Sequence, residues 1–373
     1  MSFIPGVESV VPALIVAFAA AALLSLVLTP FVRRFSKAFG LVDRPDPRRV
    51  NLRPVPRAGG LAVAGAFLPV AIVVVVLADR SALGSAVMPG TVHPSELGAL
   101  LIGGLLAAAI GFIDDARQIR ARWQLIGQVG IALVAVGLGI TVDAIANPVG
   151  PGLIALGEVL AAAFSMLWIV GMINSINFID GLDGLSSGIA LIAAVTLGLI
   201  SLTTVLGQPF IAILCFVLAG ALLGFLRWNF HPASIFAGTS GVMFVGYTLA
   251  VLSILGTAKV AVALLVLGVP IIDTFWIIVR RLANRGSPFT PDRGHVHHRL
   301  LDLGLSHTQT VLLIYAITAI LAVLSFVLSG ASQLYAFLGV VVASGIVLFL
   351  LTGREHVQED LEADTYEDPR GSV

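Results

Sequence analysis

Four polar side chains at a strict three-residue spacing form the most chemically distinctive segment of the sequence. They are Asn174, Asn177, Asp180 and Asp183 of Asn-Ser-Ile-Asn-Phe-Ile-Asp-Gly-Leu-Asp-Gly-Leu. An unbroken α-helix would spread them over roughly half of its circumference, at about 300° per step. Gly181 and Gly184 disfavour such a helix, because glycine costs about 1 kcal/mol per helical position and readily takes positive φ. We therefore predict a helix that ends near Asn177, followed by a tight turn that presents both aspartates as oxygen ligands.

A pair of adjacent carboxylates, Asp114 and Asp115, lies where an apolar run ends. Adjacent carboxylates in a partly buried place repel each other, which favours a compensating cation. The pair suits a metal site or a general base. A solvated helix end, with Arg117, Arg120 and Arg122 as partners, explains it equally well.

Three histidines, His295, His297 and His298, form a dense donor cluster between Arg293 and Arg299, without an acidic residue among them. Zinc is the first alternative, but the sequence has neither a His-Glu-x-x-His motif nor a cysteine ligand nearby. The flanking arginines favour an anion, so we predict phosphate recognition. A basic loop that faces anionic lipid headgroups is the competing explanation.

Two further features carry charge near the apolar runs. The first is a basic loop that ends in Arg-Ala-Gly-Gly, and contact with lipid headgroups could account for it entirely. We predict that Arg53 of this loop binds substrate. The Gly-Gly pair suggests a close approach of the backbone to a ligand. Asp273 lies inside an apolar run, where a carboxylate is costly enough to suggest a function. An ion pair with Arg280, two turns further along the same face, is at least as good an explanation for Asp273. The loop's arginines are Arg48, Arg49, Arg53 and Arg57.

The composition places these clusters in a membrane protein. Of 373 residues, 58% are hydrophobic and 11% charged, against about 25% charged in soluble domains. With Cys215 as the single cysteine, no intramolecular disulfide is possible. Eleven apolar runs predict an all-α polytopic fold of about 11 transmembrane helices. Their approximate limits are 11–31, 58–78, 97–113, 123–142, 155–173, 185–206, 209–226, 241–257, 260–279, 308–328 and 331–352.

The distribution of basic residues predicts the orientation. The first run is too long for a signal-peptide core and is followed by Arg33, Arg34 and Lys37, so we predict an uncleaved helix with the N-terminus outside. Alternation then puts every Lys and Arg except Arg80 and Lys259 in inside loops or in the tail. The aspartate pair, the Asn174–Leu185 segment, the segment from Asn229 to Gly241 and the histidine cluster all fall on that same face, which predicts one cytoplasmic site. We expect residues 1–352 to form one membrane domain and residues 353–373 to form a disordered acidic cytoplasmic tail.

With these residues in place, the chain resembles the bacterial polyprenyl-phosphate N-acetylglucosamine-1-phosphate transferases, relatives of phospho-N-acetylmuramoyl-pentapeptide transferase. The resemblance runs from about Arg33 to Gln309. Its specific parts are Asp114-Asp115, the Asn174–Leu185 segment, Asn229–Gly246 and His-Val-His-His-Arg-Leu-Leu-Asp-Leu-Gly-Leu. It implies transfer of N-acetylglucosamine-1-phosphate from a UDP-sugar to undecaprenyl or another polyprenyl phosphate at the cytoplasmic face of the plasma membrane. UMP is released, and a cell-wall polymer such as lipopolysaccharide or teichoic acid is initiated.

The resemblance also implies roles for individual residues. Mg²⁺, with Mn²⁺ as an alternative, would be held by Asn177 and Asp180. The UDP-amino sugar, the lipid and the membrane are the implied partners, without nucleic acid, and a homodimer is an open alternative. The implied catalytic residues are Asp114, Asp115 and Asp180. The implied substrate-binding residues are Arg53, Gly181, Leu182, Asp183, Asn229, Phe236, His295, His297 and His298.

Two positions depart from the family pattern. The family usually has Met-Gly-Asp-Ser-Gly-Ser where this chain has Ala237-Gly238-Thr239-Ser240-Gly241-Val242, and the missing aspartate is the usual second magnesium ligand. Metal affinity should fall unless Asp114, Asp115 or Asp180 compensates, because a hard dication prefers anionic oxygen. Asn51 stands where relatives often carry histidine. A catalytically weak homologue that binds nucleotide or lipid is therefore the second hypothesis. A transporter is the third, because eleven helices and an intramembrane Asp273 are compatible with one, although its polar residues would line mid-membrane positions rather than gather at the cytoplasmic ends.

Overall fold

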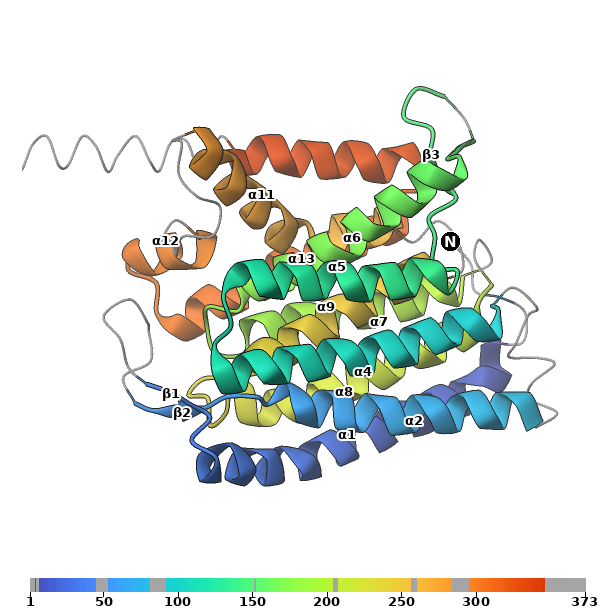
Figure 1. The fold of residues 1–373 in the computed structure, drawn as a ribbon. Helices are drawn as coiled ribbons and strands as arrows, with labels where there is room; N and C mark the ends of the chain where they lie inside the picture. Colours follow the sequence, from blue (N-terminus) through green and yellow to red (C-terminus); the bar gives the residue numbers. More distant parts are fainter. Residues whose placement is uncertain are drawn as a thin grey trace, which may run out of the picture.

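The computed structural model is a bundle of long helices (Figure 1). It describes residue 4 and residues 7–44, 53–80, 92–150, 152–203, 207–255, 260–283 and 295–345. The long helices are α1 (Val7–Ala38), α2 (Gly60–Arg80), α4 (Pro94–Arg117), α5 (Ala121–Gly137), α6 (Glu158–Ile179), α7 (Leu185–Ser201), α8 (Pro209–Asn229), α9 (Gly238–Ile254), α11 (Gly268–Ala283) and α13 (His307–Val327). Shorter helices are α10 (Val260–Val266), α12 (Val296–Asp302) and a last helix over Ala331–Gly345.

Two small antiparallel ribbons join helices at the ends of the bundle. β1 (Val42–Asp43) pairs with β2 (Val55–Pro56), with Val42 opposite Pro56. β3 (Ala144–Ala146) pairs with β4 (Leu153–Ala155).

The helices confirm the prediction of a polytopic all-α membrane protein. Within the described ranges, six helices are long and apolar enough to cross a membrane, and α10 with α11 would make a seventh. Four shorter apolar helices of 10–17 residues, namely α5, α7, α9 and Ala331–Gly345, coincide with the remaining predicted runs. The run predicted as one helix over 260–279 is two helices, bent by 78°. The predicted tail and the end of the predicted domain lie outside the described residues.

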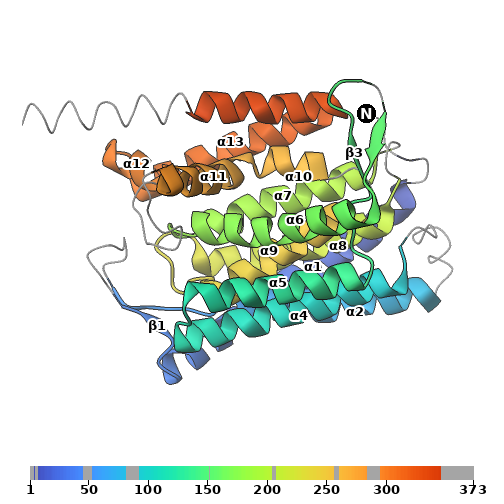
Figure 2. The ribbon, with the colours of Figure 1, turned by 45° about the horizontal axis from the view of Figure 1, so that its top comes forward.

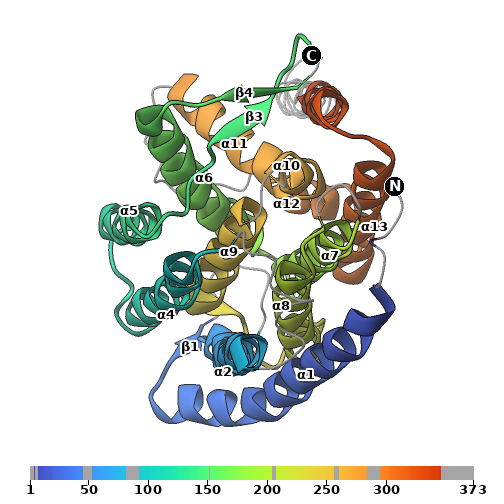
Figure 3. The same ribbon diagram turned by 90° about the vertical axis from the view of Figure 1, so that its right-hand side faces the viewer.

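The centre of the bundle is made by α7, α8 and α9, around which the other helices are arranged in the end-on view (Figure 3). Every residue of α9 from Ser240 to Ile254 is buried. On α8, Gly220 and Gly224 let α1 approach closely, since a Cβ at either position would lie 2.2 Å from a carbonyl oxygen of α1. Such small-x-x-x-small spacing is a common way for membrane helices to bring their backbones together.

Close backbone approaches also fix the start of α9. A Cβ on Gly60 of α2 would lie 1.9 Å from the Cα of Gly241, and one on Gly111 of α4 would lie 2.5 Å from the Cα of Ser240. The Gly59 and Gly60 N–H groups donate to the carbonyls of Phe236 and Ala237. The close approach suggested by the Gly-Gly pair is therefore to the α8–α9 loop of the protein itself.

The polar segments predicted to form one site lie at one end of the bundle. The β1–β2 ribbon and α12 mark this end in Figures 1 and 2, and the N-terminus lies at the opposite end. The turn between α6 and α7 begins after Ile179, two residues later than the helix end predicted near Asn177. Arg48, Arg49, Asn51 and Arg293 lie outside the described residues.

Candidate active site

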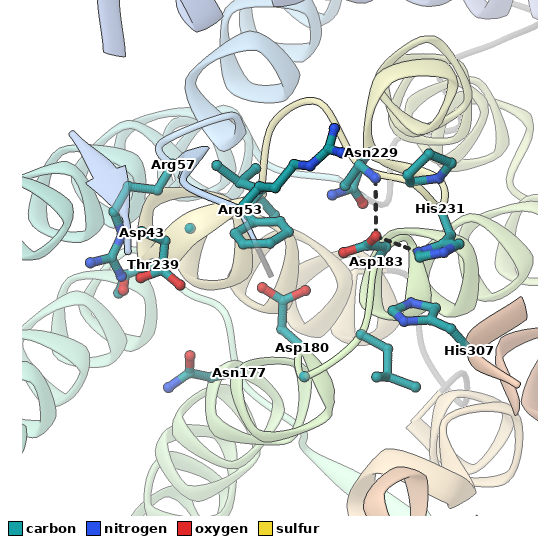
Figure 4. Close-up of a pocket in the computed structure, with 18 of the residues that line it drawn as sticks. Asp43, Arg53, Arg57, Asn177, Asp180, Asp183, Asn229, His231, Thr239 and His307 are labelled. Atoms are coloured by element: carbon teal, nitrogen blue, oxygen red, sulfur yellow. Dashed lines mark hydrogen bonds and ion pairs between the residues drawn. The ribbon is translucent and has the colours of Figure 1, made fainter. Parts of the chain in front are cut away.

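A cavity of about 640 Å³ opens among the segments that the sequence singled out (Figure 4). Its wall is formed by the β1–β2 ribbon, the α6–α7 turn, the α8–α9 loop, and one histidine each from α12 and α13. Nine of the predicted site residues line it: Arg53, Asn177, Asp180, Gly181, Leu182, Asp183, Asn229, Phe236 and His298. Four do not, namely Asp114, Asp115, His295 and His297.

The α6–α7 turn presents its two aspartates to this cavity. Gly184 closes the turn with φ of 78°, a left-handed conformation that glycine adopts without strain. Oδ2 of Asp183 accepts a 3.0 Å hydrogen bond from the Ala233 N–H and lies 2.7 Å from Nδ1 of His231. Asn174 points elsewhere, because its amide donates to Gln128 Oε1 at 2.6 Å. The four polar residues of the segment thus divide into Asn174, which contacts Gln128 of a neighbouring helix, and three residues that line the cavity.

The carboxyl of Asp180, which lines the cavity, has a strongly raised pKa. Removal from water raises the pKa of its carboxyl to about 7; the charges of Asp115 and Asp183 add to the rise, while a hydrogen bond from Ser186 and the charge of Arg57 oppose it. In the described chain Ser186 is the only side chain that donates a hydrogen bond to Asp180. A cation near Asp180 would relieve this repulsion, and carboxylate and carboxamide oxygens suit Mg²⁺. The donor set of Asn177 and Asp180 therefore fits the ion that the resemblance implies.

Asp114 and Asp115 lie behind the cavity wall, at 5% and 3% exposure. Asp115 caps the start of α9 by accepting from the Thr239 N–H at 2.9 Å, the Ser240 N–H at 3.0 Å and the Ser240 hydroxyl at 2.7 Å. Its ion pair is with Arg57, at 3.4 Å from Nε. The alternative of a solvated helix end is wrong, because both carboxylates are buried and hydrogen-bonded.

Thr239 separates this buried pair from the cavity that it lines. Its hydroxyl donates to Oδ2 of Asp114 at 2.5 Å, and the Ile119 N–H donates to Oδ1 at 2.9 Å. An aspartate at position 239 would bring a third carboxylate against Asp114 and Asp115. Threonine instead donates a hydrogen bond to Asp114 and so stabilises the buried pair. The cavity wall then has a neutral hydroxyl at position 239 in place of the carboxylate of the family pattern.

The three histidines form a stack of which only His298 reaches the cavity. The ring of His297 lies between the rings of His295 and His298, at centroid distances of 5.4 and 4.4 Å. Burial, together with the neighbouring histidines, lowers the pKa of His297 well below its usual value. Neither ring nitrogen of His297 has a hydrogen-bond partner among the described residues, and the ring does not line the cavity.

The cavity also contains residues that were not predicted as site residues. Arg57 lines it beside Asp43, and His231 and His307 stack at 4.1 Å next to Asp183. Asp183, His231 and His307 hold potential ligand atoms within 4.8 Å of one another. His231 could have been found from its place between Asn229 and Phe236, but His307 lies in an ordinary helix start after Ser306 and gives no such signal.

The comparison with known proteins identifies the class of protein. Residues 97–257 match the model of glycosyl transferase family 4. A Bacillus subtilis protein described as a probable undecaprenyl-phosphate N-acetylglucosaminyl 1-phosphate transferase is 35% identical over 325 residues, which cover 86% of each chain. The decaprenyl-phosphate N-acetylglucosaminephosphotransferase of Mycolicibacterium smegmatis is 35% identical over 89% of this chain and 86% of that protein.

A more distant relative also matches over most of both chains. The undecaprenyl-phosphate alpha-N-acetylglucosaminyl 1-phosphate transferase of Thermotoga maritima is 28% identical over 85% of this chain and 90% of that protein. The chain therefore belongs to glycosyl transferase family 4. Within that family it is similar to the polyprenyl-phosphate N-acetylglucosamine-1-phosphate transferases, and it is a multi-pass membrane enzyme of this phosphotransferase type.

Proposed function

We propose that this enzyme transfers N-acetylglucosamine-1-phosphate from UDP-N-acetylglucosamine to a polyprenyl phosphate. An oxygen of the lipid phosphate attacks the β-phosphorus of the nucleotide sugar, the bond from that phosphorus to the bridging oxygen breaks, and UMP leaves. The observation that carries the proposal is the convergence of the α6–α7 turn, two arginines and His298 on one cavity. The product is the first lipid-linked sugar of an envelope polysaccharide.

The residues of the cavity divide between the two substrates. Arg53, Arg57 and His298 offer positive or neutral hydrogen-bond donors to phosphate oxygens, which matters because two anionic phosphates must approach each other. Asp183 and Asn229 lie on the side that we assign to the nucleoside. The exposed apolar faces of the surrounding helices leave room for the polyprenyl chain in the membrane.

A divalent ion would complete this arrangement. Asn177 and Asp180 would hold Mg²⁺, or Mn²⁺ in its place, and the ion would neutralise charge on the diphosphate during transfer. Asp180 supplies the anionic oxygen, while Ser186 orients its carboxylate by a hydrogen bond. Asp115 and Asp114 act from behind, since they hold the start of α9 and thereby the wall residue Thr239.

We also propose that the cavity opens to the cytoplasm in the plasma membrane. The bias of Lys and Arg toward the predicted inside loops supports this orientation. The position of the cavity at the end of the bundle opposite to the N-terminus agrees with a helix that starts outside.

The test is UMP release by the purified full-length protein in detergent or lipid nanodiscs. The reaction contains UDP-N-acetylglucosamine, undecaprenyl phosphate and Mg²⁺, and omission of the lipid serves as the blank. Release of UMP that requires the lipid phosphate supports the proposal. No release above the blank, where a Thr239→Asp variant is active, would contradict catalysis by the natural chain.

A second candidate function is favoured by Thr239 alone. With one carboxylate fewer than its relatives at the cavity wall, the protein could bind the nucleotide sugar without turnover. Isothermal titration with UDP-N-acetylglucosamine separates the two functions. Binding without UMP release selects the binding protein, whereas binding with release selects the transferase.

A further inference from the structure

A buried aspartate of α11 holds the histidine helix from outside the cavity. Asp273 is 1% exposed, and both of its carboxylate oxygens contact the start of α12. Oδ2 lies 2.7 Å from Nδ1 of His295, and Oδ1 accepts a 2.9 Å hydrogen bond from the Val296 N–H. No ion pair joins Asp273 to Arg280 in the described chain, so that sequence-based explanation is wrong.

These two contacts attach α12 to the bundle. A helix of 7 residues is too short to be stable alone, and its first N–H groups have no partner inside the helix. Asp273 satisfies the Val296 N–H in the way that an N-cap side chain normally does. The cap comes from another helix, so it also fixes where α12 begins relative to α11.

A row of ring contacts connects His295 to the cavity. The ring of His295 packs against His297 at an interplanar angle of 14°, and His297 packs against His298, which lines the cavity. On its other side, His297 fills the space above Gly181, where a Cβ would lie 2.1 Å from Nε2. A shift of His295 would therefore move both His298 and the α6–α7 turn.

The carboxylate also decides which nitrogen of His295 carries a proton. An ionised carboxylate can only accept a hydrogen bond, so with Asp273 ionised the ring nitrogen of His295 at 2.7 Å donates and Nδ1 carries the proton. Nε2 is then an acceptor in the neutral ring and a second donor in the imidazolium. The charged groups and rings that face His295 are Asp273, His297 and Phe178, and the only negative charge among them is that of Asp273.

We propose that Asp273 is a positioning residue for phosphosugar transfer, acting through His295 to place His298 at the cavity. The proposal rests on the function proposed above for the same site. Asp273 does not line the cavity, so it is not itself a catalytic residue.

A kinetic double-mutant cycle tests whether Asp273 acts through His295. Asp273→Asn keeps the size of the side chain and an acceptor for the Val296 N–H, but it removes the charge that holds Nδ1–H. We expect kcat/KM for UMP release to fall about 10- to 100-fold, as for loss of a charge-assisted hydrogen bond. The double variant Asp273→Asn, His295→Gln should be no slower than the slower single variant. Asp302→Asn, at an exposed position of the same helix, is the matched control and should leave the rate unchanged.

Two kinetic results would overturn the proposal. One is that the effects of Asp273→Asn and His295→Gln multiply, because independent effects mean that Asp273 does not act through His295. The other is an unchanged rate in Asp273→Asn when His295→Gln is impaired.

A second measurement does not depend on activity. With selective ¹⁵N labelling of the 7 histidines, the wild type should give a low-field Nδ1–H proton signal from His295, separate from any signal of His231, whose Nδ1 faces Asp183. The His295 signal should disappear in Asp273→Asn and in His295→Gln but persist in Asp302→Asn. If the signal behaves in this way while the wild type releases no UMP, the function proposed for the site fails and the contact stands. If the wild type releases UMP but the signal is absent or survives Asp273→Asn, the positioning role fails and the function stands.

Discussion

Asp114 and Asp115, at the end of α4, accept hydrogen bonds from the start of α9 and from Ile119, whereas Asp180 and Asp183, in the α6–α7 turn, face the cavity. Both pairs are rich in carboxylate, and both occur where an apolar helix ends. The first pair accepts hydrogen bonds from Thr239, Ser240 and Ile119. Asp180 receives one from Ser186 in the described chain and has a pKa raised to about 7. The hydrogen-bond partners of a carboxylate, more than its position in the sequence, decide whether it stabilises the wall of the cavity or is available to a ligand.

The largest effect is expected from removing the buried carboxylate that caps α9. Asp115→Ala leaves the Thr239 and Ser240 N–H groups and Arg57 without their buried partner. Breaking a buried ion pair costs about 3–5 kcal/mol. We expect a loss of that order in the free energy of unfolding, measured by denaturant titration in detergent. A fully stable but inactive Asp115→Ala would instead give this residue a direct role in the reaction.

Asp180 should behave in the opposite way. Asp180→Asn removes the anionic oxygen at the cavity without emptying a buried network, so stability should hold while kcat falls about 10²- to 10³-fold, as when one charge-stabilising group is lost. UMP release as a function of Mg²⁺ concentration measures the effect. Asp143→Asn, at an exposed residue of the loop before β3, is the control. Equal loss of stability in Asp180→Asn and Asp115→Ala would remove the distinction between the two pairs.

Thr239 contacts the buried aspartate pair and also lines the cavity. Its variants therefore test whether its hydroxyl is needed to stabilise the cavity wall. Thr239→Val removes the donor to Asp114 and should cost about 1–3 kcal/mol of stability, because a buried acceptor loses its partner. Thr239→Ser keeps the hydroxyl and should stay close to the wild type. Thermal unfolding of the three proteins, each in the same detergent, gives the comparison. A Val variant as stable as the Ser variant would show that the hydroxyl is dispensable for the wall.

The smallest effects should come from the two asparagines of the same segment. Asn177→Ala removes a cavity oxygen and should raise the Mg²⁺ concentration needed for half-maximal UMP release by about 10-fold, comparable to the loss of one ligand-shell partner. Asn174→Ala should not change it, because Asn174 contacts Gln128, and should cost only about 1 kcal/mol of stability. Equal metal dependence in both variants would contradict the division of the segment.

Much of this arrangement could be predicted from the sequence. Hydropathy alone locates the helices, because each apolar run must bury its length in lipid or in protein. It does not show that the run over 260–279 bends between Val266 and Gly268, since both halves are apolar and the bend depends on what they pack against.

Only some of the residues that line the cavity could be predicted, because the sequence does not show which side chains point into it. Loop position and residue type predict that Asn177, Asp180, Asp183 and His298 lie close together, and these residues do line the cavity. Which side chains point inward depends on tertiary hydrogen bonds that span more than a hundred residues, such as the one from the Thr239 hydroxyl to Asp114. Sequence therefore could not tell that Asp114, Asp115, His295 and His297 lie behind the wall, or that His307 joins it.

The most direct test of the site is UMP release by the wild type, Asp180→Asn and Asp143→Asn measured side by side. Each reaction contains UDP-N-acetylglucosamine, undecaprenyl phosphate and Mg²⁺, and each protein is first shown to be folded and monodisperse. If transfer takes place at the α6–α7 turn, the wild type and Asp143→Asn should release UMP in a lipid-dependent way. The rate of Asp180→Asn should be at least about 10²-fold lower, which is the lower bound expected for the loss of a charge-stabilising group. Equal release by all three proteins, or none from the wild type, would contradict transfer at this turn.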